Sequence, residues 1–138
     1  MKSADRAFIC DYAHHPAEIR QSALSIRELY SNKRITAIFQ PHLYTRTRDF
    51  YQEFADSLAL FDDVILTDIY PARELPIPGV TSQLIADNLK PGVPCTLCQK
   101  GEVTDIVRQR CNDIEILVLL GAGDLENQAN EITDIMKD

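Results

Sequence analysis

Residues 39–49 read FQPHLYTRTRD, a polar stretch that lies between two apolar segments. The apolar residues before it predict a strand at 34–40, and those after it recur at helical spacing and predict a helix at 47–61. The stretch itself is too polar for a core and too regular for a linker. In α/β proteins, binding residues collect where a strand ends just before a helix. These residues therefore predict an α/β fold with a binding site at this point.

The same alternation of strand and helix continues along the whole chain. Strands are predicted at 6–12, 34–40, 64–70, 94–98 and 114–120, and helices at 16–30, 47–61, 82–89, 102–110 and about 125–136. Such alternation predicts one α/β domain over 1–138, with a mostly parallel sheet, right-handed crossovers and helices on both faces.

Composition and charge exclude some classes of protein. The chain has 138 residues, enough for one domain with its own core, and a formal net charge of −7. An acidic chain is a poor general nucleic-acid binder, although a local arginine cluster can still bind the phosphates of a nucleotide. No apolar stretch approaches the roughly 20 residues that span a bilayer. The first residues, MKSADRAF, lack the apolar centre of a signal peptide. We therefore expect a cytoplasmic protein with no membrane or nucleic-acid partner.

Cys95 and Cys98 have the C-x-x-C spacing of redox and zinc sites. A thioredoxin-type pair opens a helix, whereas this pair lies inside the apolar run PCTLC, and no second pair is spaced to complete a zinc site. We therefore expect buried or half-buried free thiols and no metal site.

Polar clusters follow four of the predicted strands, at 11–15, 40–48, 68–74 and 121–124. Ligands of open parallel sheets bind beyond the carboxyl ends of the strands, and those ends share one edge of the sheet. We therefore expect these four clusters to form one site.

The cluster after the first strand contains Asp11, His14 and His15. A carboxylate can accept hydrogen bonds from ribose hydroxyls, and imidazoles can bind oxyanions or accept protons. Adjacent histidines on an extended segment point in opposite directions and are poor joint metal ligands. The alternative is that Asp11 is a local acceptor for backbone N–H groups and that the histidines are merely exposed.

The arginines of the second cluster, Arg46 and Arg48, can bind a carboxylate or phosphate through their planar guanidinium groups. If Thr45 or Thr47 caps the following helix, the first-turn amides add an anion site. Basic residues at a helix N-terminus oppose the helix dipole, so their placement is unfavourable unless an anion binds. The alternative is a solvated helix start in which the arginines pair with Asp49 or Glu53.

The third and fourth clusters carry weaker signals. Asp68 could supply a carboxylate to a metal or substrate, or simply lie in a turn stiffened by proline. The sequence GAGD at 121–124 could bring backbone close to a ligand, or form a tight turn with Asp124 as a helix cap. The chain has no phosphate loop, nucleophile elbow or H-E-x-x-H motif.

Taken in order, DYAHHP at 11–16, FQPHLYTRTRD at 39–49, DIYPARELPIPGVTS at 68–82 and LLGAGD at 119–124 resemble the C-terminal domain of the Mur ligases. The resemblance covers nearly the whole chain. DYAH-x-P recurs across several Mur-type ligases, whereas FQPH-x-YTRTRD is more specific to the members that join L-alanine to UDP-N-acetylmuramate.

This resemblance implies a Rossmann-like domain of a three-domain enzyme of peptidoglycan synthesis. In the family, an N-terminal domain binds the UDP-sugar, and a central domain holds ATP and magnesium. The muramoyl carboxylate is activated as an acyl phosphate, and the amine of L-alanine attacks it. The first two domains lie outside this chain, so we expect no ATP hydrolysis or ligation by the chain alone.

The resemblance also implies roles for individual residues. Asp11 would contact the ATP ribose with Tyr12 nearby, whereas His14 and Arg46 would face the muramoyl–alanine end of the substrate. The substrate-binding residues implied in this way are His14, His15, His42, Tyr44, Arg46, Arg48, Gly121, Gly123 and Asp124, with Tyr70 shaping the same cleft.

One position departs from the family pattern, and two other identities stay open. Many members have arginine where Leu43 stands, so a contact from that position is lost or moved here. The related ligase that recycles the murein tripeptide is one alternative, although it usually differs from YTRTRD. A phospho-receiver module is another, because its length and βα units are similar. Such a module needs a lysine directly after the fifth strand, and the sequence GAG at 121–123 offers none.

Overall fold

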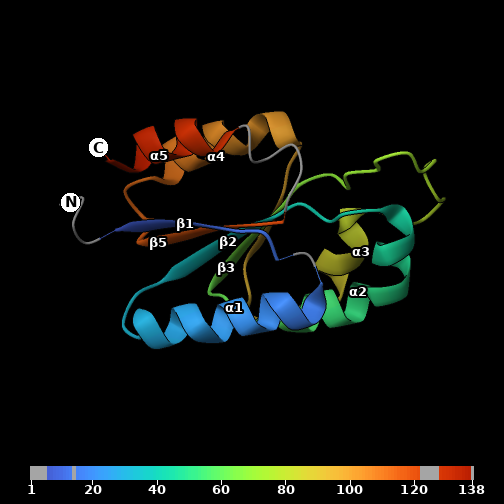
Figure 1. Ribbon diagram of the computed structural model, residues 1–138, viewed down its shortest axis with the longest axis horizontal. Helices are drawn as coiled ribbons and strands as arrows, with labels where there is room; N and C mark the ends of the chain where they lie inside the picture. The colour runs from blue at the N-terminus through green and yellow to red at the C-terminus, as the bar shows by residue number, and fades with distance from the viewer. Residues whose placement is uncertain (1–5, 14, 122–127, 138) are drawn as a thin grey trace.

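A computed structural model describes residues 6–13, 15–121 and 128–137, and it places a five-stranded sheet between two layers of helices (Figure 1). The strands are β1 Ala7–Asp11, β2 Ile35–Phe39, β3 Asp63–Leu66, β4 Cys95–Leu97 and β5 Ile116–Leu120. The helices are α1 Pro16–Leu29, α2 Tyr44–Leu58, α3 Ser82–Asp87, α4 Val103–Arg110 and α5 Ala129–Lys137, with a 3-10 turn at Lys100–Glu102 before α4.

The sheet has the strand order β1-β5-β2-β3-β4, and all four pairings are parallel. The chain therefore returns from the edge strand β4 to insert β5 between β1 and β2. Every residue of β2 and β5 is buried. Their sequences, ITAIF and ILVLL, are apolar except for Thr36, because helices cover both faces of a central parallel strand.

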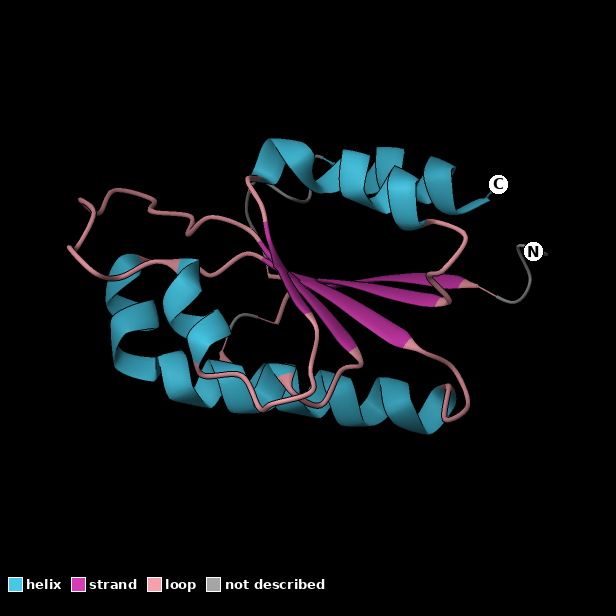
Figure 2. Cartoon of the chain, turned by 180° about the vertical axis from the view of Figure 1, so that it is seen from behind, coloured by secondary structure: helices cyan, strands magenta, loops and turns pink. Residues whose placement is uncertain are grey.

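Helices α1, α2 and α3 cover one face of the sheet, and α4 and α5 cover the other (Figures 1 and 2). Successive side chains of β2 alternate between these layers: Phe39 packs with α1 and α2, whereas Ile38 packs with α4 and α5. The rings of Phe39 and Phe54 lie 5.3 Å apart between centroids. The predicted α/β fold with helices on both faces is therefore confirmed.

Several predicted boundaries differ from the structure by a few residues, and two of the differences affect the polar clusters. Helix α2 begins at Tyr44 rather than at residue 47, so the arginines lie inside its first turns. Strand β3 ends at Leu66, so Asp68 and Tyr70 lie in the loop that follows it. The backbone of this loop pairs with the segment after β2 instead of extending the β2–β3 ladder, through an isolated bridge between His42 and Tyr70.

The direction in which the helices leave the sheet places the site. After β2 and β3 the chain turns to the face that holds α2 and α3, whereas after β4 and β5 it turns to the face that holds α4 and α5. After β1 the chain turns to the face that holds α1, so neighbouring strand ends diverge between β1 and β5, between β5 and β2 and between β3 and β4. Crevices of this kind are where open α/β sheets bind ligands. Within the described ranges, no helix is long and apolar enough to cross a membrane.

Candidate functional site

The carboxyl ends of the parallel strands bring the predicted clusters to one edge of the sheet. Asp11 ends β1, Gly121 follows β5 and Gln40 follows β2, and these are neighbouring strands in that order. His14, Gly123 and Asp124, which the sequence also indicates, lie outside the described residues. The expectation that these clusters share one edge is confirmed for the residues that the structure describes.

The start of α2 differs from the predicted cap. Leu43, not Thr45 or Thr47, is the N-cap residue, with φ 72° and ψ 136°. The fully buried Thr47 donates its hydroxyl to the Leu43 carbonyl at 3.0 Å and its backbone N–H to the same oxygen at 3.2 Å. Leucine is a poor N-cap and a positive φ is unfavourable for it, so sequence rules could not place the helix start here.

Glu74 fills the anion position that we expected to stand open at this helix end. One of its carboxylate oxygens accepts the Thr45 N–H at 3.1 Å, and the other accepts the Thr45 hydroxyl at 2.5 Å. The bond from the Thr45 hydroxyl, helped by the backbone N–H groups of Thr45 and Tyr44, lowers the pKa of Glu74. The chain thus supplies its own carboxylate to the first-turn amides of α2.

The two arginines of the motif have different environments. Arg48 is exposed and donates to Asp49 at 2.9 Å, the arrangement that the solvated alternative expected. Arg46 is half-buried, and its Nη1 is buried without a hydrogen-bond partner in the part of the chain that the structure describes. A buried guanidinium nitrogen without an acceptor is unfavourable, so Arg46 is the arginine that is ready for an anion.

His42 and Tyr70 link the segments that follow β2 and β3. Their rings lie 4.9 Å apart between centroids. The Tyr70 N–H donates to the Pro41 carbonyl, and the Leu43 N–H donates to the Tyr70 carbonyl, both at 2.8 Å. These contacts hold two loops together at the entrance of the strand-end crevice.

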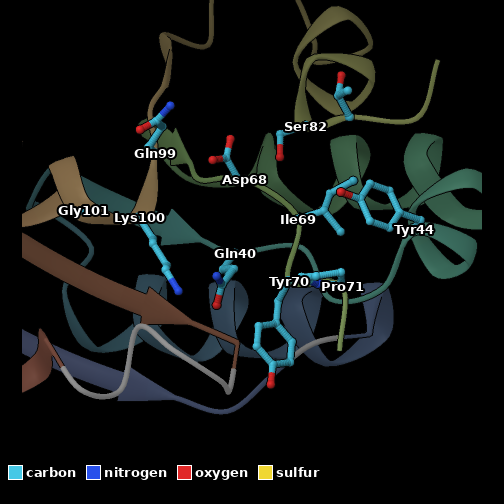
Figure 3. A pocket seen from close by; sticks show the side chains of 11 residues that line it. Gln40, Tyr44, Asp68, Ile69, Tyr70, Pro71, Ser82, Gln99, Lys100 and Gly101 are labelled. Atoms are coloured by element: carbon cyan, nitrogen blue, oxygen red, sulfur yellow. The ribbon is translucent and has the colours of Figure 1, made fainter. Parts of the chain in front are cut away.

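A cavity of about 560 Å³ opens beside this link (Figure 3). The side chains around it include Gln40, Tyr44, Asp68, Ser82 and Lys100. Gln40 is only 2% exposed, and its Oε1 has no hydrogen-bond partner among the described residues. Sequence reasoning did not single out this residue. The available signal was a lone amide side chain directly after a strand that is apolar except for Thr36.

At the end of β1, Asp11 is already a local acceptor. Its Oδ1 accepts the Ala13 N–H at 2.9 Å, and its Oδ2 accepts the Ser22 hydroxyl at 2.5 Å. The alternative in which Asp11 accepts local backbone bonds is therefore observed. A carboxylate has about four acceptor positions, so Asp11 retains capacity for a further donor. Tyr12 beside it is 56% exposed.

Gly121 connects three strand ends. Its N–H donates to the Asp11 carbonyl at 3.1 Å, and a Cβ at this position would lie 3.1 Å from the Gln40 carbonyl oxygen. Its φ of +89° is also unfavourable for other residues. The close approach observed at Gly121 is to the backbone of this chain, and an approach of the GAGD sequence to a ligand stays a prediction.

The two thiols of the C-x-x-C pair pack on opposite faces of the sheet. Cys95 packs against the core under α1, α2 and α3, whereas Cys98 packs against the core under α4. Both are free thiols, and burial raises the pKa of each to about 11. An odd spacing of three along an extended segment places side chains on opposite faces, which explains the separation.

A family model described as "Mur ligase, glutamate ligase domain" matches residues 1–129 of this chain. The chain belongs to the Mur ligase family. This membership replaces the phospho-receiver alternative. It also gives the strand-end cluster a context, because the matched region contains the motifs after β1, β2, β3 and β5.

Similar proteins within the Mur ligase family are described as UDP-N-acetylmuramate–L-alanine ligases. The one from Phocaeicola vulgatus is 57% identical over 136 residues, which is 99% of this chain and 29% of that protein. The one from Flavobacterium johnsoniae is 41% identical over 138 residues, which is 100% of this chain and 30% of that protein. The chain therefore spans less than a third of the length of these relatives.

Solved structures give the same result for the fold. UDP-N-acetylmuramate–alanine ligase of Thermotoga maritima matches with a TM-score of 0.69 and 26% identity, covering 92% of this chain and 26% of that one. A murein peptide ligase of Psychrobacter arcticus matches with a TM-score of 0.73 at 14% identity, covering 95% of this chain and 28% of that one. The second likeness concerns the fold alone.

Proposed function

We propose that this chain is the C-terminal domain of the ATP-dependent ligase that joins L-alanine to UDP-N-acetylmuramate. The observation that carries the proposal is the Nη1 of Arg46, inside the motif FQPHLYTRTRD at the carboxyl edge of the sheet. This atom is buried and has no hydrogen-bond partner among the residues that the structure describes. The relatives described as L-alanine ligases favour this reaction over tripeptide recycling.

In this proposal, Arg46 binds the anionic muramoyl–alanine end of the substrate. His14, which lies outside the described residues, is assigned to the same end of the substrate only by the resemblance. A planar guanidinium group presents two parallel N–H donors to a carboxylate or phosphate, so it orients the anion as well as attracting it. Arg48 is a weaker candidate for binding the substrate anion than the sequence indicated, because its guanidinium group already donates to the Asp49 carboxylate.

ATP is the implied cosubstrate, and Asp11 is the residue of this chain that fits it. The Asp11 carboxylate can accept a ribose hydroxyl beside the bonds that it already accepts. Magnesium prefers carboxylate, carbonyl and water oxygens. The described residues include no group of three or more His, Cys, Asp or Glu side chains that could hold a metal ion, so we assign none of them to magnesium.

The remaining parts of the enzyme complete the site. The relatives are more than three times as long as this chain, and we assign the UDP-sugar, the triphosphate and its magnesium to those additional regions. The chain alone therefore binds weakly and does not turn over. The cytoplasmic location expected from the sequence stays a prediction.

The test is a kinetic comparison in the full-length enzyme that contains this chain. Loss of a charge-assisted hydrogen bond in Arg46→Ala lowers kcat/KM for the ligation of L-alanine by about 10- to 100-fold. Arg20→Ala, which removes an exposed arginine on α1, is the control and keeps the wild-type rate. Wild-type kinetics in Arg46→Ala, or ligation by the isolated chain, would contradict the proposal.

A further inference from the structure

The loops after β2 and β3 are joined at several points. The Tyr70 backbone exchanges hydrogen bonds with Pro41 and Leu43, and the Glu74 carboxylate takes both the N–H and the hydroxyl of Thr45. The partners of the Glu74 contact lie 29 residues apart in the chain. The first turn of α2 is therefore held by the neighbouring loop as well as by its own helix.

Unfavourable backbone conformations occur in both joined segments. Leu43 has φ 72° and Ala72 has φ 53°, and these are the positive-φ residues other than glycine in the described ranges. Such conformations persist only where surrounding contacts over-determine them, and they concentrate at binding sites. Leu43 caps α2, and Ala72 lies two residues before Glu74. The hydrogen bonds of Glu74 and Tyr70 therefore join the segment that contains Leu43 to the segment that contains Ala72.

Arg46 lies between the two fixed threonines of this turn. Thr45 is bound by Glu74 from outside the helix, and the buried Thr47 is bound to Leu43 from inside it. The backbone that carries the Arg46 side chain therefore has little freedom to rotate. Glu74 also occupies the first-turn amides, so an incoming anion meets the guanidinium of Arg46 rather than the helix end.

We propose that Glu74 is a positioning residue, which holds the first turn of α2 so that the guanidinium of Arg46 faces the substrate anion. The inference rests on the proposed function, because it requires that Arg46 contacts the substrate. Glu74 itself touches no substrate. Its action passes through the two hydrogen bonds to Thr45 and the helix turn that they fix.

The deciding experiment measures whether Glu74 acts through Arg46 in the full-length enzyme. We expect Glu74→Gln, which keeps the shape but loses the charge and one acceptor, to lower kcat/KM for L-alanine ligation by about tenfold. In an Arg46→Ala background the same substitution has no further effect, because residues that act as one unit are not additive. Thr45→Val, which removes the hydroxyl that Glu74 binds, lowers kcat/KM by the same factor. Thr45→Ser, which keeps a hydroxyl, retains the wild-type rate.

Glu53→Gln, an exposed carboxylate substitution on the same helix, is the matched control and leaves the rate unchanged. Equal losses from Glu74→Gln in the wild-type and Arg46→Ala backgrounds would overturn the inference, because a general structural role costs the same in both. Wild-type kinetics in Glu74→Gln would overturn it as well.

A measurement on this chain separates failure of the inference from failure of the proposed function. In nuclear magnetic resonance spectra of the chain, Glu74→Gln shifts the Arg46 side-chain Nε–H signal, whereas Glu53→Gln does not. An unmoved Arg46 signal would overturn the inference whatever reaction the enzyme performs. A full-length enzyme that fails to ligate L-alanine, with the Arg46 signal still shifted, would refute the proposed function alone.

Discussion

Gly121→Ala tests whether the ends of β5 and β2 are packed as closely as the structure shows. The new methyl group would lie 3.1 Å from the Gln40 carbonyl oxygen, and the backbone would keep φ +89°. Both the close contact and the positive φ destabilise the fold. Alanine variants of two other glycines allow the two effects to be measured separately. Gly92 has φ +96° with nothing within 4 Å of its Cβ position, and Gly101 has open space without a positive φ.

The expected magnitudes follow from these environments. A positive φ costs a residue with a Cβ about 1–2 kcal/mol, so we expect Gly92→Ala to lower the free energy of unfolding by that amount. The tight contact with a backbone oxygen adds about 1–3 kcal/mol, so Gly121→Ala should lower it by about 2–5 kcal/mol. Gly101→Ala should instead raise it by up to about 1 kcal/mol, because alanine restricts the unfolded chain.

Urea unfolding of the three variants, followed by circular dichroism, measures these differences directly. For a domain of this size, each kcal/mol also changes Tm by roughly 3–5 °C. Unchanged m-values would show that the variants unfold from the same native state. A Gly121→Ala variant no less stable than Gly92→Ala would refute the close approach of β5 to the Gln40 carbonyl. Equal stability of all three variants would refute the backbone argument as well.

Two further predictions concern buried groups. Gln40→Met removes a buried acceptor that has no partner within the described ranges. We therefore expect the free energy of unfolding, measured with urea, to stay constant or rise by up to about 2 kcal/mol. A clear loss of stability would show that the Gln40 side chain is hydrogen-bonded in the native state. Because the pKa values of Cys95 and Cys98 are raised to about 11 and the thiolate is the reactive form, alkylation at pH 8 should label the exposed Cys10 well before them, as read by mass spectrometry. Labelling of Cys95 or Cys98 at the rate of Cys10 would contradict their burial.

The fold could be predicted largely from local patterns. The apolar sequences of β2 and β5 and the helical spacing of apolar residues after each strand indicate a parallel sheet with helices on both faces. The order of the strands could not be predicted in this way, because the position of β5 between β1 and β2 depends on contacts between distant segments.

The start of α2 shows the limit of local rules at the site itself. A leucine with a positive φ caps this helix, against both cap and backbone preferences, because Thr47 and the backbone of Tyr70 bind the Leu43 backbone from inside and outside the helix. Sequence reasoning uses the preferences of each residue, and these usually indicate where a helix begins. Here they placed the start of α2 three residues too late, because contacts from other parts of the chain override them.

The sequence by itself determined the residue types of the site and their places after successive strands, since parallel strands bring those places to one edge. Only the tertiary structure decided which residues are already satisfied. Arg46 and Arg48 look alike in the motif, but Arg48 donates to Asp49, whereas Arg46 has a buried nitrogen that finds no acceptor in the described part of the chain. Likewise, the N-terminus of α2, where the sequence indicated an anion site, already binds the Glu74 carboxylate. The physical reason is that burial and hydrogen bonding depend on neighbours in space, which the order of residues along the chain does not reveal.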